Sequence, residues 1–67
     1  MTSPEIFKER LNDEHSDLSE KVSKLESFIS NGKPESLTQE HFLLLQHQLQ
    51  HMKAYLAVLT DRIELLK

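Results

Sequence analysis

The chain has 67 residues, a formal net charge of −3 and no cysteine. Its length allows one small domain, and the lack of thiols excludes disulfides and thiolate metal sites. The acidic balance, with a sequence pI of about 5.7, argues against polymeric nucleic acid and membrane surfaces as partners, because both attract basic faces.

The first predicted helix begins near Ser3 and Pro4, because Ser3 suits the N-cap and Pro4 the first helical position. Core-type residues then recur at alternating spacings of four and three, which indicates a heptad seam. The seam of this helix consists of Leu11, His15, Leu18, Val22, Leu25 and Ile29. We predict a helix over about residues 4–30.

A short connection follows the first helix. Asn31 or Gly32 suits the left-handed conformation that ends a helix, and Pro34 prevents its continuation. These residues predict a loop over about residues 31–38.

The second predicted helix covers about residues 39–66. Thr38 suits its N-cap, and Leu37 with Phe42 has the spacing of a hydrophobic staple. Its seam again alternates spacings of three and four. The members are Phe42, Leu45, Leu49, Met52, Leu56, Leu59, Ile63 and Leu66.

Two helices of similar length with a short connection predict an all-α, antiparallel two-helix hairpin, which forms one domain over residues 1–67. Several apolar residues lie off the two seams. They are Ile6, Phe7, Phe28, Leu43, Leu44, Val58 and Leu65. A lone hairpin would leave them in water, so we expect hairpins to assemble into a symmetric, homo-oligomeric helical bundle, with a dimer as the minimum.

Catalytic and metal chemistry receive little support. His47 and His51 have a zinc-compatible spacing, but Gln48 stands where a metalloprotease has its glutamate, and no third ligand is evident. The acidic cluster Asp13, Glu14, Asp17 and Glu20 lacks a calcium-loop glycine and suits a solvated helix face with pairs such as Glu20–Lys24. No nucleophile–base arrangement is visible. We therefore expect no enzyme, no metal and no cofactor.

A polar and aromatic row repeats every seven residues on the second helix, directly before seam positions. We call His41, Gln48, Tyr55 and Arg62 the flanking row. Its ordinary role is to set helix pairing. A more specific hypothesis is that the row forms part of a ligand pocket between chains. Tyr55 would stack on a flat group, and Arg62 or the neighbouring Lys53 would bind an anion. Gln48 would hydrogen-bond a base or ribose.

The spacing of these residues resembles a known hairpin. The matching positions are Leu18, Lys21, Val22, Lys24, Leu25, Glu26, Phe28, Ile29, Leu37, Leu45, Gln48, Leu49, Met52, Tyr55, Leu56, Leu59, Arg62 and Ile63. This pattern, over residues 18–66, resembles the helical hairpin domain shared by phage anti-CBASS and anti-Thoeris sponge proteins and small crAss-like phage proteins. The resemblance implies an oligomer that binds cyclic nucleotide immune signals between chains and does not degrade them.

The leading hypothesis is therefore a phage-type immune-evasion sponge for a cyclic oligonucleotide or related nucleotide messenger. We expect it in the cytoplasm, which is the host cytoplasm if the chain is phage-encoded. The candidate ligand-binding residues are Gln48, Lys53, Tyr55 and Arg62. The alternative is an oligomeric helical adaptor that binds proteins and no small molecule. A third hypothesis is a small metal-binding bundle that uses His47 and His51.

Overall fold

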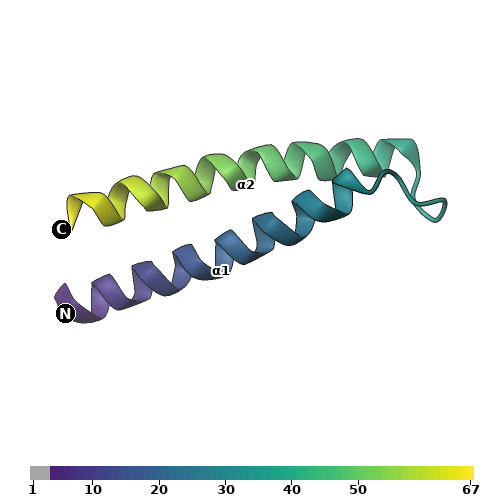
Figure 1. Ribbon diagram of the computed structural model, residues 1–67. Helices are drawn as coiled ribbons and strands as arrows, with labels where there is room; N and C mark the ends of the chain where they lie inside the picture. Colours follow the sequence, from purple (N-terminus) through teal and green to yellow (C-terminus); the bar gives the residue numbers. More distant parts are fainter. Residues whose placement is uncertain (1–3) are drawn as a thin grey trace.

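A computed structural model describes residues 4–67, and the expected cap at Ser3 lies outside this range. The chain forms two α-helices, α1 (Pro4–Ser30) and α2 (Gln39–Leu65). They run antiparallel, so that the start of α1 and the end of α2 lie at the same end of the molecule (Figure 1). The described residues contain no strand. The predicted all-α hairpin is confirmed.

The core lies along the predicted heptad seams. Every seam residue of both helices is buried or half-buried. The buried side chains are Leu11, Leu18, Val22, Phe42 and Leu59. Leu59 is the most enclosed of them, with none of its surface exposed, and Leu49, Met52, Leu56, Ile63 and Leu66 pack around the cluster. Apolar residues at three-four spacing thus produce the helices and also hold them together.

The connection between the helices uses the expected residues. Gly32 has a φ of +88°, and its N–H donates to the carbonyl of Ile29 at 3.0 Å. At the start of α2, the Thr38 hydroxyl accepts a hydrogen bond from the His41 N–H at 3.0 Å. The left-handed glycine and the threonine cap therefore satisfy backbone groups that the helix ends leave unpaired.

The molecule is a thin rod and has a single layer of helices. Its radius of gyration is 15.4 Å, whereas a compact domain of this length would have about 11 Å. Because each helix has only one neighbour, most of its circumference faces outward. Within residues 4–67, neither helix is long and apolar enough to cross a membrane.

Candidate functional site

The flanking row lies on the outside of α2. Gln48, Tyr55 and Arg62 are all exposed, and Tyr55 retains 46% of its accessible surface. A step of seven residues in an α-helix advances about 10 Å, so Gln48 and Arg62 lie about 21 Å apart along the axis. The row is therefore an extended edge, and its members do not converge on one point within a single chain.

Arg62 is held against the other helix. Its guanidinium carbon lies 5.9 Å from the centroid of the Phe7 ring, which belongs to α1. A cation over an exposed aromatic ring gains about 0.5–1 kcal/mol. This contact restrains the arginine at the open end of the hairpin, and the side chain stays exposed there.

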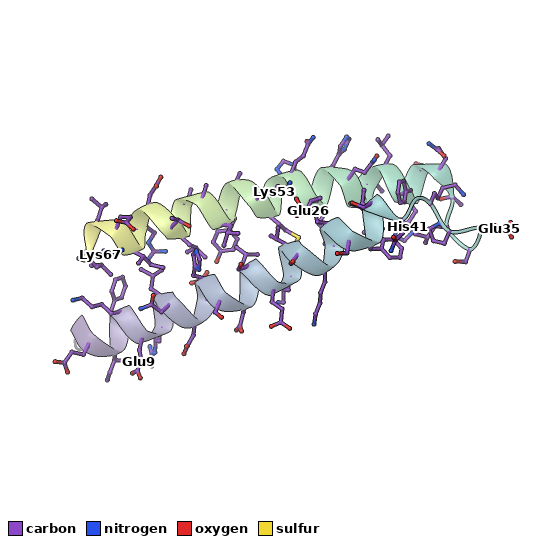
Figure 2. The ribbon with its side chains drawn as sticks, in the orientation of Figure 1. Glu9, Glu26, Glu35, His41, Lys53 and Lys67 are labelled. Carbon is purple, nitrogen blue, oxygen red and sulfur yellow. The ribbon has the colours of Figure 1, made fainter. Side chains whose placement is uncertain are left out.

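Lys53 lies on the other flank of the seam. It follows the core residue Met52, whereas Arg62 precedes the core residue Ile63, and these two heptad positions lie on opposite flanks. Lys53 forms an ion pair with Glu26 of α1, and Figure 2 shows the two side chains meeting between the helices. Lys53 therefore lies on the flank opposite Arg62, and a carboxylate of α1 neutralises its charge.

A groove borders the flanking row near the start of α2. It has a volume of about 380 Å³ and is lined by Thr38, Glu40, His41, Leu44, Leu45 and Gln48. Its size falls within the usual range for small-molecule sites, roughly 300–1,000 Å³. Leucine side chains supply an apolar surface, while the Gln48 amide and the His41 imidazole supply polar groups. Such a lining suits a flat ring with hydrogen-bonding edges.

Two other grooves have different chemistry. One, also about 380 Å³, follows α1 and is lined by Arg10, Asp13, Glu14, Asp17, Leu18 and Lys21. Its carboxylates outnumber its cations, which disfavours an anionic ligand. The other, about 290 Å³, lies at the open end and is lined by Lys8, Asn12, Ile63, Leu66 and Lys67. Lys67 pairs with Glu64 at 2.9 Å, which reduces its attraction for an anion.

The histidines and the acidic cluster form no metal centre in the part of the chain that the structure describes. No group of three or more His, Asp or Glu side chains is placed there to hold an ion. His47 and His51 are exposed on α2. Glu20 forms the predicted ion pair with Lys24 at 3.0 Å, so the acidic segment is a solvated helix face.

Three contacts between the helices were not predicted from the sequence. The first joins Phe7 to Arg62, and the second joins Glu26 to Lys53. The third joins His15 to Thr60. The heptad positions contain the signal for the first two. Each seam alternates two kinds of position. In an antiparallel hairpin, residues directly before seam positions of the first kind face one another across the two helices. Residues directly after seam positions of the second kind also face one another.

A known protein family matches the chain. No curated protein matches the chain. No solved structure matches it. The model of the family described as Sequestin matches residues 5–65, which is nearly the whole chain, and the chain therefore belongs to the Sequestin family.

Proposed function

We propose that this protein binds a cyclic nucleotide, or a related nucleotide messenger of bacterial immunity, and sequesters it without degrading it. Family membership over residues 5–65 carries this proposal, because the name Sequestin denotes sequestration. The resemblance of residues 18–66 to phage sponge hairpins supports the class of messenger. In a phage-encoded protein, the host cytoplasm is where such capture would act.

The exposed flanking row supplies suitable chemistry. The Tyr55 ring offers a stacking surface for a base. The Arg62 guanidinium, steadied by Phe7, offers paired donors for a phosphate. Gln48 borders the groove at the start of α2 and offers a donor and an acceptor for a base or ribose edge. Lys53 lies on the opposite flank beside Glu26, so we leave it out of the site.

Sequestration requires affinity and abundance rather than turnover. The binding sites must outnumber the messenger, and the dissociation constant must lie below the concentration at which the messenger signals. The proposed residues bind and orient the ligand, and none of them is assigned a bond-breaking step. The ligand should therefore leave the protein chemically unchanged.

A thermal-shift screen with cyclic dinucleotides, cyclic trinucleotides and cyclic ADP-ribose isomers tests the proposal. A ligand at one hundred times its dissociation constant should stabilise the fold by about 2.7 kcal/mol, which raises the melting temperature by about 10 °C or more. Mass spectrometry of the ligand released by denaturation should return the intact messenger. No shift with any compound, or a cleaved product, would overturn the proposal.

Matched variants locate the site. We expect Tyr55→Ala and Arg62→Ala to abolish the shift while circular dichroism keeps its helical signal. Lys53→Ala removes a cation from the opposite flank and should leave the shift unchanged. Loss of the shift in the Lys53 variant alone would move the site to the other side of the hairpin.

A protein-binding adaptor is the second candidate. It is favoured by one observation, the exposed apolar side chains along α2, which include Leu44, Val58 and Leu65. An adaptor would bind a partner helix and ignore every nucleotide in the screen. Stabilisation by one nucleotide class would reject it.

A further inference from the structure

The groove at the start of α2 is formed by a single chain. Its lining combines two leucines, Leu44 and Leu45, with four polar residues, Thr38, Glu40, His41 and Gln48. Glu40 and Gln48 lie two turns apart, about 12 Å along the helix axis, and Leu44 lies midway between them. The groove therefore has a polar group toward each end and an apolar stretch between them.

The charge of the groove disfavours a phosphate. No lysine or arginine lines it, whereas Glu40 supplies a carboxylate. Within residues 4–67, this carboxylate forms no ion pair. The nearby loop lysine, Lys33, donates instead to the carbonyl of Leu37 at 2.8 Å. A phosphate in the groove would meet a negative charge without a compensating cation, so the groove suits the base of a nucleotide rather than its phosphates.

Hydrogen-bond acceptors stand at both ends of the groove. The Glu40 carboxylate has two acceptor oxygens and no donor. The Gln48 Nε2 atom donates to the sulfur of Met52 at 3.8 Å. Because a thioether sulfur can only accept, the amide nitrogen faces Met52 and the carbonyl oxygen stays open to a ligand. The Thr38 hydroxyl and the His41 imidazole can donate or accept, so the ligand must bring its own donors to Glu40 and Gln48.

Guanine is the base whose edge fits a carboxylate. It carries two adjacent donors, N1–H and the N2 amino group, which can bond the two oxygens of one carboxylate together. Adenine and cytosine carry an amino group beside a ring nitrogen whose lone pair a carboxylate repels, and uracil carries one N–H between two carbonyls. We propose that the groove binds the guanine of a nucleotide messenger, whose N1–H and N2 amino groups donate to Glu40 and whose ribose hydroxyl donates to Gln48.

This inference rests on the proposed function and deepens it by naming the class of messenger, one that contains guanine. Glu40 is then the residue that determines base selectivity. Tyr55 lies about 10 Å beyond Gln48 along the axis of α2 and offers its exposed ring to a second base. A messenger whose bases are all adenine would lack the paired donors that the Glu40 carboxylate requires.

Isothermal titration calorimetry with cyclic di-GMP, cyclic di-AMP and cyclic di-IMP tests the selectivity, because these ligands differ only in their bases. The wild-type protein should bind cyclic di-GMP at least about tenfold more tightly than cyclic di-AMP. Hypoxanthine, the base of cyclic di-IMP, keeps N1–H and lacks the N2 amino group, so the affinity for cyclic di-IMP should lie between the two. An affinity for cyclic di-AMP equal to or above that for cyclic di-GMP would overturn the inference.

Matched variants assign the selectivity to one residue. Glu40→Gln replaces one acceptor oxygen with an amino group and should weaken cyclic di-GMP binding about tenfold, with cyclic di-AMP binding within about threefold of wild type. Glu35→Gln removes the same charge at the tip of the loop (Figure 2), outside the groove lining, and should keep the wild-type preference. Because Glu40 also lies in the first turn of α2, where a carboxylate stabilises a helix, circular dichroism checks that both variants are folded.

The possible outcomes distinguish this inference from the proposed function. A guanine preference that survives Glu40→Gln, or that is lost equally in Glu35→Gln, would overturn the role of Glu40. Binding of an adenine-based messenger alone, such as a cyclic ADP-ribose isomer, would overturn the guanine assignment and keep the proposed function. Binding of no nucleotide at all would overturn both.

Discussion

The Nε2 atom of His15 lies 2.9 Å from the hydroxyl oxygen of Thr60, and this contact joins α1 to α2. The Thr60 hydroxyl also donates its proton to the carbonyl of Leu56 at 3.0 Å. Because a hydroxyl has only one proton, His15 must donate through Nε2–H and Thr60 must accept. The polar side chain on the seam of α1 is thus bonded across the hairpin.

Removal of the acceptor should weaken the hairpin. Thr60→Val keeps the branched shape and deletes the hydroxyl, so we expect a loss of about 1 kcal/mol in the free energy of unfolding. Urea denaturation at fixed protein concentration measures it. Thr60→Ser keeps the hydroxyl and is the control. A cycle with His15→Ala should show that the two changes are not additive, and additive losses would contradict the contact.

Leu59 should be the most sensitive apolar position. None of its surface is exposed, and Leu11, Leu18 and Val22 belong to the same cluster. Leu59→Ala should cost about 2–5 kcal/mol, through lost burial and a residual cavity. Leu43, which is 49% exposed, supplies the control. Urea midpoints should fall sharply for the first variant and barely for Leu43→Ala, and equal losses would contradict the assigned core.

Substitution of Gly32 should destabilise the protein only through its backbone conformation. Its φ is +88°, and no atom lies within 4 Å of the position that an added Cβ would occupy. Gly32→Ala should therefore cost about 1 kcal/mol from the left-handed conformation, without any steric clash. Gly32→Asn should cost less, because asparagine tolerates this region better. Thermal unfolding compares the two variants, and an alanine variant as stable as wild type would contradict the assigned conformation.

Arg62→Lys tests whether the shape of the cation matters. Lysine keeps the charge but loses the planar guanidinium that stacks on Phe7 and offers paired donors. We expect the affinity for the messenger found in the screen to fall about tenfold, as measured by isothermal titration calorimetry. The oligomeric mass should stay the same. An unchanged affinity would show that Arg62 acts only as a point charge or lies outside the site.

The heptad pattern made the hairpin predictable. Its three-four spacing, the threonine cap and the glycine stop yielded α1 over Pro4–Ser30, and α2 differs from expectation only in ending at Leu65. Every seam residue is buried or half-buried, because helix periodicity alone decides which residues share a face. The exposure of Gln48, Tyr55 and Arg62 follows from the same periodicity.

The sequence by itself determined the two helices, their buried seams and the surplus of apolar residues outside those seams, since each depends on spacing within one helix. Only the tertiary structure decided which flanking residues meet across the hairpin. It paired Arg62 with Phe7 on one flank and Lys53 with Glu26 on the other. The reason is physical: contacts between helices depend on their relative direction and register, which the packing of both seams and the connecting loop fix together.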